Sequence, residues 1–189
     1  MPDTTLTPCP SFGDLNCNTE AVALSAATGF ALVSIAIPIG LHTHLASLIR
    51  FVYGASIPTV GASSLSVNGT DRLLALQPNQ LFLLFAYNGH RAVEVVAEKL
   101  GNNGYYTDQS DAWTMLRISG PATTAVLGHI CMLDLDPAVF PIDAVTRTIM
   151  DHLPVIILRE SLESFLLMSP RSSAKSFIRA VELSVAHLG

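Results

Sequence analysis

Charged residues are scarce in this chain. Only 13% of its 189 residues are charged, and Lys99 and Lys175 are its only lysines. Soluble domains usually carry roughly 25% charged residues. The formal net charge is −5, and no two Lys or Arg residues are adjacent. Because nucleic-acid binding depends on Lys and Arg contacts with phosphates, we exclude nucleic acid as a partner.

Cysteine is also rare, with Cys9, Cys17 and Cys131 as its only occurrences. An odd count without regular spacing does not indicate a disulfide framework. His129 lies two residues before Cys131, but a single pair without a second cluster is a weak signal for zinc. We therefore expect no metal ligands on this chain and a reduced, cytoplasmic setting.

Motifs that bind nucleotides or activate a nucleophile are missing. The chain has no Gly-x-Gly-x-x-Gly run, no P-loop and no Gly-x-Ser-x-Gly elbow. His42 and His44 are two residues apart, a spacing that does not place them on one helical face. We expect no dinucleotide site and no hydrolase site on this chain.

One apolar stretch, residues 21–41, contains no charge. Its length would suffice to span a membrane. Gly29, Pro38 and Gly40 interrupt it, however, and no basic cluster flanks it. We expect a short buried helix or linker that leads into a strand at 32–38, with a membrane anchor as the alternative. The high hydrophobic content, 50%, is consistent either with a large core or with burial against another protein.

The order of patterns predicts an α+β fold built from two related ferredoxin-like, split βαβ halves. Residues 1–20 are polar and rich in Pro and Thr, which predicts an extended arm. The first half, 21–112, and the second half, 113–189, each combine strands with helices. In the first half we expect strands at 32–37, 73–76 and 81–85, with helices at 41–52 and 92–100, before a strand at 113–118.

The second half continues from that strand into a helix that starts near Pro121, since Pro favours the first helical position. We expect a further helix over 142–150, a hairpin formed by 154–158 and 164–168, and a last helix after Pro170. Phe177 and Val181 fall on one face of that last helix.

Polar residues at the end of the first half and in the second half offer two sets of candidates. Asp108 and Asp111 precede the strand at 113–118, where we expect Asp108 and Ser110 to bind loop amides. The second set is expected to be an internal or interfacial group of ion pairs, formed by Asp134, Arg117, Arg159 and Arg171.

An ordered series of short motifs resembles one family. The series runs through Asp108–Trp113, Leu116–Pro121, Cys131–Pro137, Phe140-Pro141, Arg159 and Pro170–Ser172. Its first part is similar to the signature of the aminomethyltransferase-like, folate-binding fold. The whole series resembles the gamma subunit of heterotetrameric sarcosine oxidase. Two departures, Ile130 in place of a glycine and the lack of tryptophan in 75–82, leave open which N-methyl amine is the substrate, such as dimethylglycine or a methylated proline.

The resemblance implies a non-catalytic, structural subunit of a flavoenzyme complex. The partners would be alpha, beta and delta type subunits, which carry FAD, FMN, NAD, tetrahydrofolate and zinc. No catalytic, cofactor-binding or metal-binding residue is then expected on this chain. We expect the loop 134–141 and the arm to contact those partners, because Phe140 has no evident core position.

The alternative is a free-standing folate-binding or aminomethyltransferase-like protein. In that fold, Asp108 and Asp111 would lie beside a central cavity, where a carboxylate could bind a pterin or orient a methylene carrier.

Overall fold

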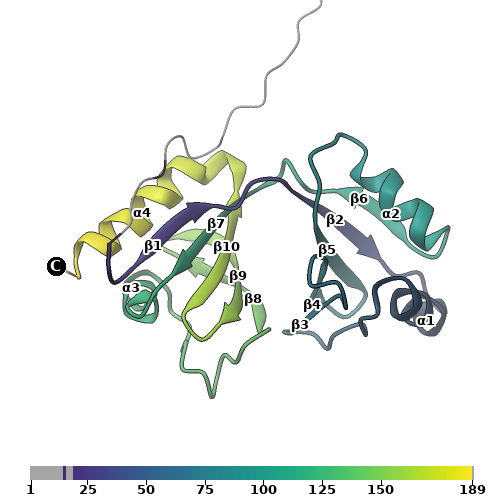
Figure 1. Ribbon diagram of the computed structural model, residues 1–189, viewed down its shortest axis with the longest axis horizontal. Coiled ribbons are helices and arrows are strands. Elements are labelled where there is room, and N and C mark those ends of the chain that lie inside the picture. The colour runs from purple at the N-terminus through teal and green to yellow at the C-terminus, as the bar shows by residue number, and fades with distance from the viewer. Residues whose placement is uncertain (1–14, 16–18, 189) are drawn as a thin grey trace, which may run out of the picture.

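The computed structural model describes residue 15 and residues 19–188, and it contains two five-stranded antiparallel sheets. The sheets face each other, and two helices cover the outer face of each one (Figure 1). The result is a four-layer arrangement of helices, sheet, sheet and helices. Most of the expected arm, 1–20, lies outside the described residues.

The first sheet is assembled entirely from the first half. Its strands are, in spatial order, β3 (Ser63–Leu65), β4 (Arg72–Gln77), β5 (Gln80–Ala86), β2 (Phe30–Ala36) and β6 (Tyr105–Asp108). The helices α1 (His42–Tyr53) and α2 (Ala92–Leu100) cover it. Gly54 ends α1 with φ +65°, a left-handed conformation that favours glycine. We predicted that a strand at 113–118 would follow α2 and complete this half. The strand that does so is β6.

The second sheet has the order β1 (Ala23–Ala26), β7 (Trp113–Ser119), β10 (Ser164–Pro170), β9 (Leu153–Ser161) and β8 (Val145–Met150). It is covered by α3 (Thr123–Ile130) and α4 (Ala174–Ala186), which follows the short 3-10 helix η1 (Arg171–Ser173). The predicted hairpin is confirmed as β9 and β10, and the predicted last helix as α4. The fold class, an α+β protein with two related halves, is confirmed.

Two sequence predictions about elements were wrong. Residues 142–150 do not form a helix, because Val145, Thr146 and Thr148 belong to β8, which pairs along its length with β9. β-branched side chains of this kind suit a strand. Residues 23–26 are not a helix or linker but β1, which pairs antiparallel with β7 from Ala23↔Ser119 to Ala26↔Leu116.

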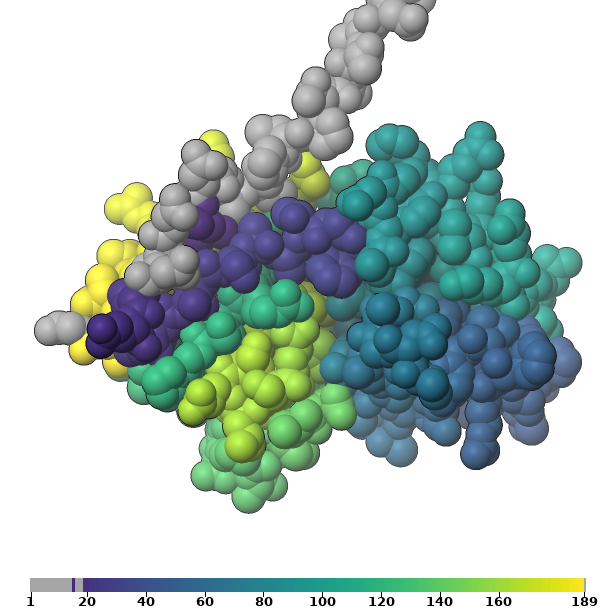
Figure 2. Space-filling view, viewed as in Figure 1, coloured from purple at the N-terminus to yellow at the C-terminus, as the bar shows by residue number. Residues whose placement is uncertain are grey.

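Strand β1 belongs to the sheet of the second half, although it precedes the first half in the sequence. Our division of the chain placed residues 21–112 in the first half, yet β1 lies in the sheet of the second half. The segment from β1 to β2 therefore passes from one sheet to the other, and in Figure 2 its purple atoms run over the yellow and green half as far as the edge of the teal half. None of the helices in 19–188 is long and apolar enough to cross a membrane.

Burial on both faces of the central strands explains the hydrophobic composition. A cluster between the sheets includes Leu32, Phe82, Ile156 and Leu166, while alternate residues of the same strands pack under the helices. The sequences of strands covered on both faces are nearly continuous runs of apolar residues. The large core thus accounts for much of the excess of apolar residues.

Candidate functional site

Asp108 uses its carboxylate to shape the turn after β6. Its Oδ1 atom accepts a hydrogen bond of 2.9 Å from the Ser110 amide, and Ser110 Oγ accepts one of 3.0 Å from the Leu32 amide. The bond to Asp108 is the expected contact with a loop amide, whereas Ser110 binds an amide of strand β2 and not of the loop. The two bonds tie the turn to β2 of the first sheet.

Asp111 lies at the surface. Its fully exposed carboxylate is 3.3 Å from Nη1 of Arg171. The Arg171 amide also donates to the Ala112 carbonyl at 2.9 Å. An ion pair exposed in this way contributes little to stability, because solvent screens it. Both carboxylates that we singled out thus join the turn before β7 to its surroundings.

The ion-pair set expected around Asp134 does not form. Arg117 instead pairs with Glu160, through Nε–Oε2 at 2.6 Å and Nη2–Oε1 at 3.0 Å. These hydrogen bonds raise the pKa of the Arg117 guanidinium, against the lowering effect of its burial. Sequence could not find the pair, because β7 and β9 become close only through β10, which lies between them.

Arg159 is the most unusual polar residue, because it is fully buried. Its Nη1 donates to the Leu162 carbonyl at 2.9 Å, and its Nη2 donates to the Leu135 carbonyl. The guanidinium lies 4.6 Å from the centre of the Phe165 ring. Burial lowers the pKa of Arg159, and the charge of Asp136 acts in the opposite direction. Arg159 therefore fixes the loop that contains Leu135.

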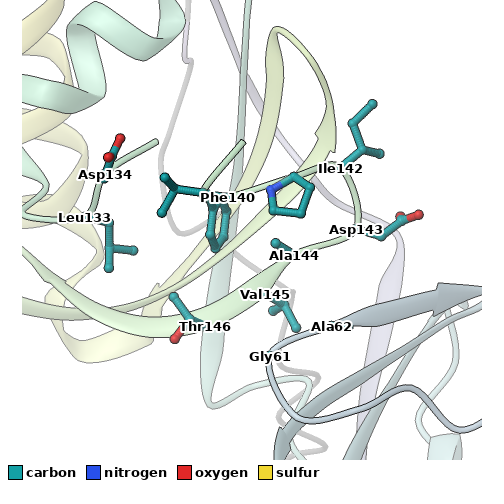
Figure 3. Close-up of a pocket in the computed structure, with 12 residues that line it drawn as sticks. Gly61, Ala62, Leu133, Asp134, Phe140, Ile142, Asp143, Ala144, Val145 and Thr146 are labelled. Atoms are coloured by element: carbon teal, nitrogen blue, oxygen red, sulfur yellow. The ribbon is translucent and has the colours of Figure 1, made fainter. Parts of the chain in front are cut away.

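That loop, residues 132–142, borders a cavity of about 430 Å³, in the range of roughly 300–1,000 Å³ typical of binding pockets. In Figure 3 the side chains of Leu133 and Phe140 point the same way, toward Val145 and Thr146, whereas Asp134 and Ile142 point away. Gly61 and Ala62 contribute the wall that belongs to the first half. Phe140 is buried in the core of the second half, so our view that it has no core role was wrong.

A smaller cavity of 190 Å³ lies between the sheets. Arg72, Arg117 and Glu160 line it together with apolar residues such as Phe30 and Leu166. Both guanidinium groups already have carboxylate partners, since Arg72 pairs with Asp143. The charges of this cavity are therefore balanced within the protein.

A contact between serine and histidine joins α3 and α4, which the sequence did not indicate. Ser184 Oγ donates to the Val126 carbonyl at 2.6 Å and lies 3.3 Å from Nδ1 of His129. The His129 and His187 rings are 6.4 Å apart. Because the serine proton goes to a main-chain carbonyl and Ser184 is buried, this contact ties the helices together and does not activate a nucleophile.

The described part of the chain contains no group of three or more His, Cys, Asp and Glu residues placed to hold a metal ion. Within residues 19–188, the polar residues that we considered for chemistry make structural contacts. The 132–142 loop differs from them, because it carries exposed apolar side chains beside a cavity lined largely by apolar residues.

Comparison with known proteins points to one family. No protein-family profile matches the chain. Sarcosine oxidase subunit gamma of Corynebacterium sp. (strain P-1) is 31% identical over 121 residues, which cover 64% of this chain and 59% of that subunit. The subunit of the same name from Arthrobacter sp. is 30% identical over 113 residues, or 59% of this chain and 55% of that subunit. The matches thus span less than two thirds of these curated relatives.

Solved structures share the fold. A chain of heterotetrameric sarcosine oxidase from Corynebacterium sp. U-96, in complex with pyrrole 2-carboxylate, has a TM-score of 0.77 and 23% identity, covering 90% of this chain and 87% of that chain. Aminomethyltransferase T of the glycine cleavage system from Bartonella henselae has a TM-score of 0.61 and 16% identity, covering 85% of this chain and 45% of that chain. The chain is therefore similar in sequence to sarcosine oxidase gamma subunits, and it has a fold found in heterotetrameric sarcosine oxidase and in aminomethyltransferase T.

Proposed function

We propose that this chain is a non-catalytic, structural gamma-type subunit of a heteromeric, sarcosine oxidase-like flavoenzyme complex. One observation carries the proposal: the curated relatives that match the sequence are gamma subunits, and a heterotetrameric sarcosine oxidase chain matches the fold over 90% of the present chain. The complex would oxidatively demethylate sarcosine or a related N-methyl amine.

The local chemistry of the chain supports a structural role. Asp108 holds a turn, Asp111 pairs with Arg171, and Arg117 pairs with Glu160. A general acid or base must instead lie within hydrogen-bond reach of the substrate proton that it transfers. Ser184 of α4 is buried against α3, and its hydroxyl donates to the main-chain carbonyl of Val126.

In this proposal the redox chemistry resides on the partners. Alpha, beta and delta type subunits would carry FAD, FMN, NAD, tetrahydrofolate and zinc, and the assembly would work in the cytoplasm. The present chain would pack against the subunits that hold flavin and folate and stabilise their arrangement.

A free-standing folate-binding or aminomethyltransferase-like protein is the second candidate. The observation in its favour is the shared fold with aminomethyltransferase T. That match is one of fold alone, at 16% identity, whereas the curated relatives that match in sequence are gamma subunits. We therefore place this candidate second.

Co-expression of the full chain, tagged, with untagged alpha, beta and delta type subunits tests the proposal. We expect one stable species in analytical ultracentrifugation that contains the tagged chain, and flavin absorbance that follows the other subunits. The isolated chain should show no absorbance in the flavin region. A monodisperse chain that ignores those subunits would favour the folate-binding candidate, and titration with tetrahydrofolate would then decide that case.

A further inference from the structure

We infer that the 132–142 loop is the surface that docks a partner subunit, and that its occupant is a partner segment with an apolar side chain next to a Lys or Arg. This inference rests on the proposed function and deepens it, because it identifies where the complex is held and by what chemistry. Four properties of the loop support it: exposed apolar side chains, preorganisation, an adjacent cavity and exposed carboxylates.

Apolar side chains on the loop face solvent. Met132 is 91% exposed, Val139 62% and Ile142 46%. The green loop that carries them projects at the lower edge of the molecule in Figures 1 and 2. A single exposed apolar residue needs no explanation, but several on one projecting segment mark an interaction site.

The loop is rigid although it lacks regular secondary structure. Asp134 Oδ1 accepts from the Asp136 amide at 2.9 Å, and Asp136 Oδ1 accepts from the Ala138 amide at 2.8 Å. The Asp136 carbonyl accepts from the amides of Val139 and Phe140 at 2.9 and 2.8 Å. From below, Arg159 binds the Leu135 carbonyl, and Phe140 is anchored in the core. A surface already held in shape loses little conformational entropy on binding.

The cavity beside the loop suits an apolar side chain. Leu133, Phe140 and Val145 line its wall, and their side chains are drawn in Figure 3. Interface anchors are typically aromatic or aliphatic groups that fill such a cavity near the centre of the contact. The exposed residues Val139 and Ile142 also line it, so a partner side chain that entered would cover both.

The loop carries two exposed carboxylates, and neither forms an ion pair with another described residue. Asp134 and Asp136 are exposed, and the residues that line the cavity include no Lys or Arg. Asp143 is paired with Arg72, Arg159 is buried beneath the loop, and Arg147 of β8 lies over the Phe82 ring, 6.0 Å from its centre. The charge of Asp136 is partly offset by Arg159 beneath it. Asp134 points away from the cavity, at its rim (Figure 3), where a Lys or Arg next to the apolar side chain of the partner would complement it.

The test measures binding of the full chain to the purified assembly of the other three subunits. Val139→Asp and Met132→Asp should each weaken binding at least about tenfold, the loss typical of an interface anchor. Phe51→Asp is the matched control, since Phe51 is 87% exposed but lies on α1 of the other half. It should bind within about twofold of the parent chain. Circular dichroism should show that all three variants are folded.

A second variant isolates the charge. The double change Asp134→Asn and Asp136→Asn keeps the oxygen that accepts each amide but removes both charges. Association should become slower and less sensitive to salt, because rim charges act mainly on the association rate. Amides of 132–142 should also gain protection from hydrogen exchange in the complex.

Three outcomes would overturn the inference. If the parent chain binds and Val139→Asp binds equally well, the loop is not the docking surface, although the proposed function stands. If the chain alone self-associates in ultracentrifugation and Val139→Asp abolishes this, the occupant is a second copy. If the parent chain does not bind the other subunits at all, the proposed function fails and the docking inference fails with it.

Discussion

Arg72 of β4 and Asp143, at the end of the 132–142 loop, form an ion pair that joins the two halves of the protein. Arg72 Nη1 also donates to Ser63 Oγ at 2.9 Å, and the Asp143 carbonyl accepts from the Ser63 amide at 2.7 Å. Asp143 has φ +69°, a left-handed conformation that Asp and Asn tolerate better than other non-glycine residues. Its charge and its backbone conformation therefore both serve the contact between the halves.

Substitutions of Asp143 should separate these two contributions. Asp143→Asn keeps the left-handed conformation accessible and removes the charge, so it should cost at most about 1 kcal/mol for this partly exposed pair. Asp143→Ala should cost roughly 1–2 kcal/mol more, because alanine is strained at this φ. Urea unfolding of both variants is the measurement. Equal midpoints for the two would show that the conformation stores no strain.

The centre of β7 should be sensitive to truncation. Leu116 is fully buried between the second sheet and its helices. Leu116→Ala should lower the free energy of unfolding by about 2–5 kcal/mol. Leu183→Ala on the exposed face of α4 is the control and should change it by less than about 0.5 kcal/mol. Thermal midpoints that are the same for both would contradict the strand assignment.

Tyr53 should make stability depend on alkaline pH. Burial raises the pKa of Tyr53, and the charges of Asp71 and Tyr106 add to the effect. The folded state therefore holds the phenol proton more tightly than the unfolded chain. The stabilisation is complete below the unfolded pKa of about 10 and is lost as pH rises toward the higher folded value.

The expected result is a decrease in unfolding free energy above pH about 10 that is shallower in Tyr53→Phe. Near neutral pH this variant should lose little stability, since the hydroxyl is buried without a hydrogen-bond partner among the described residues. Tyr105→Phe, at a mostly exposed ring, serves as the control. Parallel alkaline curves for the parent and Tyr53→Phe would refute the prediction.

Asp108 should be dispensable for chemistry. Asp108→Asn retains the oxygen that accepts the Ser110 amide, so the turn after β6 should persist. Turnover of the N-methyl amine by the assembled complex should stay within a few-fold of the parent. A loss on the order of 100-fold or more with assembly intact would indicate acid–base catalysis and favour the folate-binding candidate. Subunit content should be matched by ultracentrifugation before rates are compared.

At the 132–142 loop, one sequence prediction agrees with the structure and the reason given for it does not. We predicted that 134–141 contacts a partner, and the exposure of Val139 is consistent with that expectation, which stays a prediction. The reason that we gave, a Phe140 without a core role, was wrong, because Phe140 is buried. Whether an aromatic residue in a loop turns inward depends on the space beneath it, which is set by α3, β8 and Arg159.

Periodicity determined the elements whose residues bury a regular face. The helices α1, α2 and α4, and the β9–β10 hairpin, follow directly from apolar spacing, because those patterns are local. The motif series from Asp108 to Ser172 pointed to the gamma subunits that the comparisons also found. The sequence is also poor in charge, and the structure gives the reason: the central strands are covered on both faces, where charged side chains would be buried.

Only the tertiary structure decided which distant residues meet. The apolar spacing of 142–150 was mistaken for a helical pattern, whereas β8 pairs along its length with β9. The pairing of β1 with the edge of β7 likewise joins segments far apart in the sequence. The partners of Arg117 and Arg159 were equally hidden, since Glu160 and the Leu135 carbonyl come close only once the sheet and the loop have formed. Side-chain spacing is a property of a few neighbouring residues, whereas strand pairing and buried ion contacts depend on the whole packed chain.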